Sequence, residues 1–66
     1  MNVTINNKPV ALDEGTSLSA IAELYKVPDK GAAIALNSEI IHREDWPSTS
    51  AKEGDEILII KAFCGG

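Results

Sequence analysis

The sequence predicts an α+β protein in which one main helix packs on one face of a mixed sheet of four or five strands. Three observations lead to this fold class. Short segments alternate polar and apolar residues, one segment repeats apolar residues at helical spacing, and turn-forming residues separate them. Because one helix cannot cover both faces of such a sheet, we expect the other face to stay in water or to meet a partner.

The amino-terminal segment is predicted to form a hairpin. Residues 2–6 alternate polar and apolar side chains, which is the period of a half-buried strand. Asn6-Asn7 suits a tight turn, because asparagine adopts positive φ at lower cost than most residues. Residues 10–12 resume the alternation, and Pro9 marks an edge position or the start of this strand, since proline cannot donate to the ladder.

The main helix is predicted to begin after Thr16 or Ser17, either of which can cap its free amides. Pro28 disfavours helical backbone at Val27, so we expect it to end the helix. Four apolar residues fall on one stripe of this helix, with Leu24 at its margin: Leu18, Ile21, Ala22 and Tyr25.

A second hairpin and a helical turn follow. Residues 32–36 are predicted to form a strand with alanines on one face, and residues 39–41 a return strand after a tight turn at Asn37-Ser38. Residues 43–47 look like one irregular helical turn, in which Trp46 packs as a lid on the core. Within this turn, Arg43 is expected to pair with a neighbouring carboxylate or a backbone carbonyl.

The last strand is predicted from Glu56 to about Ala62, after a turn at Gly54-Asp55, and in parallel with the first strand across a long connection. Strict alternation points Ile57 and Ile59 into the core. Three residues then face outward, and we interpret them as a docking patch for a partner: Leu58, Ile60 and Ala62.

We expect the sequence to divide into a folded domain of residues 1–62 and a flexible reactive tail of residues 63–66. Since glycine has no Cβ, Gly65 and Gly66 can lie extended in a channel too narrow for side chains, with Phe63 and Cys64 threading behind them. The group that such a tail presents to a partner is the Gly66 carboxylate, which we interpret as the reactive centre.

Size and charge narrow the classes of protein. A chain of 66 residues forms one domain that buries only roughly 60% of its unfolded surface, which favours a carrier or binding module. The net charge of −4, with cations spread along the chain, disfavours nucleic acid and favours a basic partner protein. One cysteine excludes an internal disulfide, and neither a secretory signal nor a membrane span is seen, so we expect a cytoplasmic protein.

No catalytic or metal-binding set of residues stands out in the sequence. His42 has no second histidine and no nearby cysteine to help it hold a metal. Cys64 lacks the rigid surroundings that activate a thiol, so a small thiol enzyme is the weaker alternative. We therefore expect a protein that binds no cofactor of its own and is not an enzyme.

In this order, the features resemble the β-grasp, ubiquitin-like fold and, more narrowly, the small sulfur carrier proteins of thiamin thiazole biosynthesis. The resemblance covers essentially the whole chain. Two residues differ from the family pattern: Cys64, where a small unreactive residue is common, and His42, where we expect proline. The matching segments are Gly15-Thr16-Ser17-Leu18, Ala33-Ile34-Ala35-Leu36-Asn37, Ile40-Ile41-His42-Arg43, Trp46, Gly54-Asp55-Glu56-Ile57 and Gly65-Gly66.

The resemblance implies that an adenylating enzyme uses ATP and magnesium to convert the Gly66 carboxylate to an acyl-adenylate. Sulfur from a persulfide donor, such as a cysteine desulfurase, then replaces AMP and leaves a thiocarboxylate, from which thiazole synthase takes the sulfur. Activation by another enzyme agrees with the chemistry, because a carboxylate is ionised at neutral pH and a poor electrophile. The alternatives are a carrier for molybdopterin or another sulfur-containing product, and a non-covalent ubiquitin-like adaptor.

Overall fold

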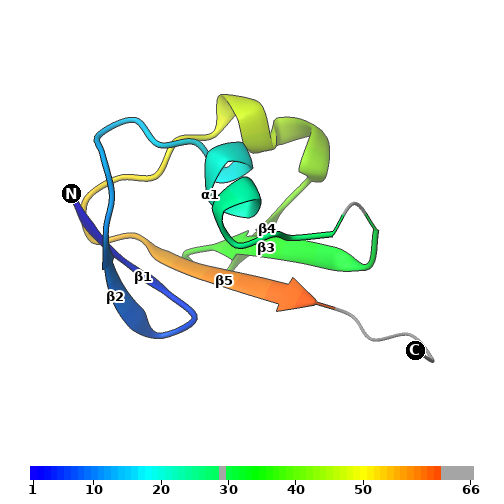
Figure 1. The fold of residues 1–66 in the computed structure, drawn as a ribbon, viewed down its shortest axis with the longest axis horizontal. Coiled ribbons are helices and arrows are strands. Elements are labelled where there is room, and N and C mark those ends of the chain that lie inside the picture. Colours follow the sequence, from blue (N-terminus) through cyan, green and yellow to red (C-terminus); the bar gives the residue numbers. More distant parts are fainter. Residues whose placement is uncertain (29, 62–66) are drawn as a thin grey trace.

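The computed structural model describes residues 1–28 and 30–61, and within them five strands form one mixed sheet in the order β2-β1-β5-β3-β4 (Figure 1). One α-helix and one 3₁₀ helix lie together on one face of this sheet (Figure 1). The elements are β1 Asn2–Ile5, β2 Lys8–Ala11, α1 Leu18–Leu24, β3 Ala32–Leu36, β4 Glu39–Ile41, η1 Arg43–Ser48 and β5 Glu56–Lys61. The predicted fold class and the order of its elements are confirmed.

The last strand lies in the middle of the sheet. β5 pairs in parallel with β1, with Thr4 opposite Glu56 and Ile5 opposite Ile57, and antiparallel with β3 on its other side. The predicted parallel pairing of the first and last strands is therefore confirmed. β5 therefore starts between two paired strands, and its residues beyond Ile57 remain paired with β3 (Figure 1).

Both hairpins turn where the sequence predicts. Asn6 and Asn7 have φ values of 53° and 68°, and Asn37 and Ser38 have 51° and 74°. Two successive residues at positive φ give the turn whose twist matches that of the flanking strands. Pro9 lies in β2 at the edge of the sheet, where a missing donor costs no ladder bond.

The helix starts as predicted but ends earlier. The Ser17 hydroxyl oxygen accepts a hydrogen bond from the Ala20 amide at 3.1 Å, so Ser17 is the N-cap. The helix stops at Leu24, because Lys26 adopts a φ of 54° and two amides fold back onto helix carbonyls. The Lys26 amide bonds to Glu23 O at 3.2 Å and the Val27 amide to Ala22 O at 2.9 Å. The prediction that Pro28 ends the helix is therefore wrong, since a Schellman motif ends it first.

Replacing Lys26 with glycine is expected to stabilise the protein. A side chain is strained at positive φ and glycine is not, so we expect the free energy of unfolding to rise by about 0.5–1 kcal/mol. Urea unfolding would measure this as a higher midpoint at an unchanged slope. Lys8→Gly is the control, because Lys8 is an exposed residue of a regular strand, where glycine is expected to lower the midpoint.

The core lies between the sheet and the two helices. Its buried residues come from the apolar stripe of α1, from the inward faces of β1, β3 and β5, from Trp46 of η1 and from Ala51 in the loop before β5. The Trp46 side chain is 3% exposed, and its Nε1–H donates to Ile41 O at 3.0 Å, as expected of a lid on the core. In the described ranges, neither helix has the length and apolar character needed to cross a membrane.

Candidate functional site

The two faces of β5 differ as the alternation predicts. Ile57 and Ile59 are buried, whereas Leu58 and Ile60 are 41% and 46% exposed on the face away from the helices. The strand thus carries apolar side chains on both faces, and only the inner set belongs to the core. Of the three residues predicted to form the docking patch, Leu58 and Ile60 are exposed, while Ala62 lies outside the described residues.

The apolar surface extends across β3 to β4. Ala35 of β3 lies opposite Leu58 on one side and opposite Ile40 on the other, and Ala33 lies opposite Ile60. Residues directly opposite each other project to the same face, so these five side chains share the outer face of the sheet. We call them the outer patch. Ile40 is 56% exposed and Ala35 only 4%, so large side chains overhang a strip of alanines.

Sequence reasoning missed Ile40. Ile40 and Ile41 are both apolar, so their alternation does not show which one faces outward. The register of β4 on β3 decides it: Ile41 pairs with the buried Ile34, and Ile40 pairs with Ala35. The signal in the sequence was the pair of alanines at positions 33 and 35. Small residues on one face of a strand leave room there for large side chains of the neighbouring strands, such as Ile40.

The side chain of Asn37 and the carboxylate of Asp55 hold the start of β5. The Glu56 amide donates to Asn37 Oδ1 at 2.9 Å, and Asn37 Nδ2 donates to Asp55 Oδ1 at 3.1 Å. The other Asp55 oxygen accepts from the Lys52 amide at 2.7 Å. These contacts fix the turn before β5, so Asp55 is a structural acceptor within that turn.

The side chain of Asn6 holds the second half of β5. β1 ends at Ile5, and beyond that point the Ile59 amide donates to Asn6 Oδ1 at 2.8 Å. A side-chain carbonyl therefore takes the place of the strand carbonyl that a longer β1 would supply. The segment leading to residues 62–66 is thus attached to the sheet on both sides as far as Ile59.

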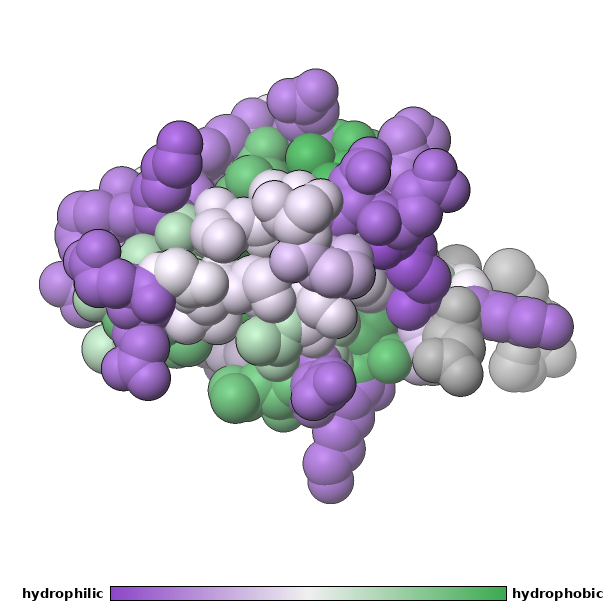
Figure 2. Space-filling view, turned by 90° about the horizontal axis from the view of Figure 1, so that it is seen from above, coloured by the Kyte–Doolittle hydropathy of each residue, from purple (hydrophilic) through white to green (hydrophobic). Residues whose placement is uncertain are grey.

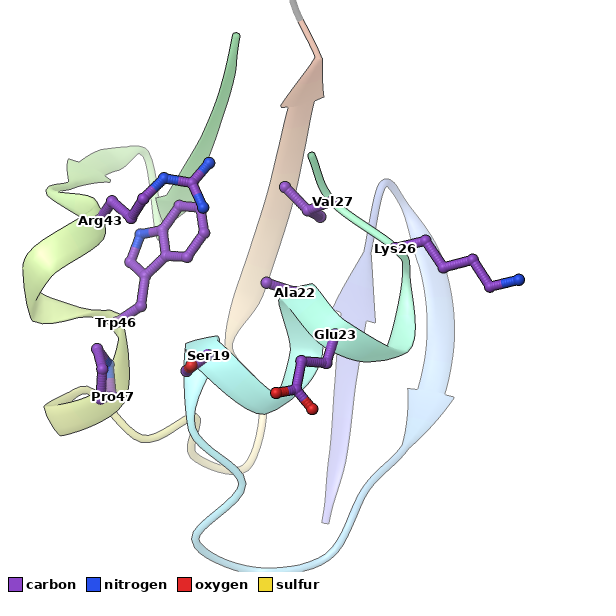
Figure 3. Close-up of a pocket in the computed structure, with 8 residues that line it drawn as sticks. All are labelled: Ser19, Ala22, Glu23, Lys26, Val27, Arg43, Trp46 and Pro47. Atoms are coloured by element: carbon purple, nitrogen blue, oxygen red, sulfur yellow. The ribbon is translucent and has the colours of Figure 1, made fainter. Parts of the chain in front are cut away.

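A shallow groove of about 350 Å³ lies on the opposite face, between α1 and η1 (Figure 3). Trp46 forms one wall, and Ala22 and Val27 from the helix side form the other (Figure 3). The Arg43 guanidinium lies 4.3 Å from the centre of the Trp46 ring and donates to Pro28 O at 2.8 Å. The prediction that Arg43 pairs with a carboxylate or a backbone carbonyl is confirmed for the carbonyl.

The face that bears the helices has mixed hydropathy. Seen from above α1 and η1, residues of intermediate hydropathy occupy the centre, and both hydrophilic and hydrophobic residues lie around it (Figure 2). The exposed large apolar side chain of α1 is Leu24, at 68%. The contiguous apolar surface formed by the outer patch therefore belongs to the other side of the sheet.

His42 precedes η1 and is exposed, and its side chain makes no capping hydrogen bond. Its backbone has φ −62°, the value that a proline imposes, so histidine fits a position where the family pattern has proline. Among residues 1–28 and 30–61, no group of three His, Cys, Asp or Glu side chains is arranged to hold a metal ion.

The residues predicted to carry the chemistry lie outside the described residues. They are Phe63, Cys64, Gly65 and Gly66. What the structure describes is their point of attachment: β5 in the middle of the sheet, with the outer patch beside its exposed side chains.

The sheet has five strands, and its first and last strands pair in parallel near its centre. One α-helix lies across one face, and the outer patch lies on the other. This arrangement defines a β-grasp protein of the ubiquitin-like kind. The ThiS family model matches residues 3–66, and the chain belongs to the ThiS family. It is 29% identical over 66 residues to the sulfur carrier protein ThiS of Escherichia coli K12, covering all of both chains.

Solved structures agree with this assignment. The crystal structure of the thiamine biosynthesis protein ThiS from Geobacter metallireducens superposes with a TM-score of 0.83 at 30% identity, over the full length of both chains. An NMR solution structure of a thiamine biosynthesis protein from the same organism gives a TM-score of 0.80 at 30% identity, covering all of this chain and 88% of that one.

Proposed function

We propose that this protein is a sulfur carrier of thiamin biosynthesis and that it acts as a protein substrate, not as an enzyme. The observation that carries the proposal is the ThiS family match, which extends through Gly65 and Gly66. The sulfur carrier protein of Escherichia coli supports it, since the two chains align over their whole lengths.

In this proposal the Gly66 carboxyl group is the reactive group. An adenylating enzyme in the cytoplasm joins it to AMP from ATP with magnesium, releasing pyrophosphate. The terminal sulfur of a persulfide, supplied by a donor such as a cysteine desulfurase, then displaces AMP, and a thiol reduces the acyl disulfide so formed. The resulting thiocarboxylate gives its sulfur to thiazole synthase. Residues 63–66 form the reactive tail, and residues 1–62 form the domain that partners recognise.

The outer patch is the surface that we propose for docking of the adenylating enzyme. Leu58, Ile60 and Ile40 are large, apolar and exposed, and Ala33 and Ala35 leave a shallow strip between them. Burying such side chains on association is favourable, at about 25 cal/mol per Å² of apolar surface. Because the patch includes the last strand, docking through it would bring residues 62–66 to the partner.

The mass of the intact protein tests the proposal. Protein isolated from cells that are making thiazole is expected to contain a fraction heavier by the replacement of one oxygen with sulfur, located in the peptide that contains Gly66. Cells supplied with thiamin provide the comparison. If neither culture yields the heavier form, even when the sulfur acceptor is absent, Gly66 does not carry sulfur and the proposal is wrong.

A further inference from the structure

β1 stops before β5 does, which leaves part of β5 without a neighbour on that side. The pairing of β1 with β5 ends at Ile5 and Ile57, and the chain then turns away through Asn6 and Asn7 (Figure 1). β5 continues for four more residues, Leu58–Lys61, which remain paired with β3. We call the space beside Ile59–Lys61, where β1 would continue, the β5 notch.

The direction of the backbone groups in the β5 notch follows from the neighbouring hydrogen bonds. Ile57 O accepts from the Asn6 amide at 2.9 Å, and the Ile59 amide donates to Asn6 Oδ1. The backbone amide and carbonyl groups of the odd-numbered residues of β5 therefore point toward β1. The Ile59 carbonyl and the Lys61 amide point the same way. Within residues 1–28 and 30–61, neither group has a hydrogen-bond partner.

These two groups match one residue of an added strand. In a parallel ladder, a single incoming residue would donate its amide to Ile59 O and accept at its carbonyl from the Lys61 N–H. An extended peptide backbone is therefore the ligand whose chemistry fits the β5 notch, as in β-strand addition at other exposed sheet edges. The other edge strand on this side of the sheet, β2, is protected by Pro9.

The β1–β2 hairpin and the end of β5, which border the β5 notch, carry lysines and no acidic residue beyond Glu56, in contrast to the net charge of −4. Residues 1–12, which include the β1–β2 hairpin, contain Lys8 and no acidic residue, and the end of β5 contributes Lys61. Lys26 follows α1, and its side chain extends toward the side where the hairpin lies (Figure 3). All three lysines are exposed, so a segment with acidic side chains is electrostatically favoured here.

We propose that the β5 notch binds an extended, acidic segment of the adenylating partner by β-strand addition. This inference rests on the proposed function for the identity of the partner. The added strand would continue the line of β1 and lie beside the last residues of β5, next to the exposed Ile60 of the outer patch. It would thereby hold the root of the tail on the side that the sheet leaves open.

Hydrogen exchange of the Lys61 amide tests the proposal directly. On adding excess adenylating enzyme from the same organism, we expect this amide to exchange at least about tenfold more slowly than in the free protein. The Ala11 amide is the control. Leu12 N–H donates to Met1 O, so the Ala11 amide points away from β1 at the open edge of β2, and its exchange should not change.

Two variants at one position separate the backbone from the charge. Lys61→Ala removes the charge and keeps the amide, whereas Lys61→Pro removes both. We expect Lys61→Pro to lower kcat/KM for adenylation at least about fivefold further than Lys61→Ala, the factor that one net hydrogen bond contributes. Lys52→Ala, in the turn before β5, has the same charge change away from the notch and should leave kcat/KM near the wild-type value.

The outcomes distinguish this inference from the proposed function. Adenylation of Gly66 with an unprotected Lys61 amide, or with equal kcat/KM for the proline and alanine variants, overturns the strand addition and leaves the carrier function standing. Protection of the Lys61 amide in the free protein that rises with its concentration would mean that a second copy occupies the notch, which also overturns it. If Lys61→Pro has a lower urea midpoint than Lys61→Ala, its loss of activity could come from lost stability. In that case the exchange of the Lys61 amide in the wild-type protein decides whether a strand is added.

Discussion

Deletion of Gly66 is expected to abolish sulfur transfer and growth without thiamin, while leaving the free energy of unfolding unchanged. The shortened chain still ends in a glycine carboxylate, but that group lies one residue, about 3.5 Å, short of its position in the wild-type protein. A misplacement of about 1 Å at a reacting centre can cost on the order of 10²-fold in rate. A displacement several times larger should leave no measurable adenylation.

The assay is complementation of a strain that lacks its own carrier, with pyrophosphate release measured on the purified proteins. The buried core residues of the described chain end at Ile59, so urea unfolding should be the same for both proteins. Gly66→Ala keeps the length of the chain and separates loss of reach from the added Cβ. Normal growth of the deletion strain would favour the non-covalent adaptor, in which the last residue has no chemical role.

The strands and turns were predictable because their signals are local. Asn6-Asn7 and Asn37-Ser38 adopt the positive φ values that tight hairpin turns need, and such residues are recognisable without knowledge of the fold. The alternation in β5 likewise separates Ile57 and Ile59 from Leu58 and Ile60. Each of these predictions depends on neighbouring residues alone.

The features that the sequence did not predict depend on pairing or on competition between signals. The helix end was misplaced because proline at position 28 is a strong signal, whereas a lysine at positive φ is a weak one. Ile40 joins the outer patch only through the register of β4 on β3. The β5 notch arises because β1 is shorter than β5, and no pattern within either strand shows that difference.

The charge pattern shows the same limit. The six cations are spread along the sequence, and their spacing does not indicate a common surface. Parallel pairing of β1 with β5 brings the hairpin turn that precedes Lys8 toward the end of β5 that carries Lys61. An acidic protein can therefore present a locally basic surface, and its net charge does not identify the charge of every partner surface.

Replacing Leu58 with aspartate is expected to lower kcat/KM for adenylation by about 30-fold or more, the loss that follows when a central interface residue is truncated. Leu58 lies in the outer patch directly opposite Ala35, and Ile40 lies on the other side of that alanine. An aspartate there removes an apolar contact and places a carboxylate in a surface that would lose water on docking. Because the side chain is 41% exposed in the free protein, the substitution should lower the free energy of unfolding by at most about 1 kcal/mol.

Leu24→Asp is the matched control, because Leu24 is 68% exposed on α1, on the other face, and the substitution and the charge change are the same. We expect Leu24→Asp to leave adenylation unchanged. Ile40→Asp extends the test to β4: a loss comparable to that of Leu58→Asp would show that the partner covers the whole outer patch, across all three strands. Equal activity of the Leu58 and Leu24 variants would contradict docking through this face, since two carboxylates on opposite faces would then act alike.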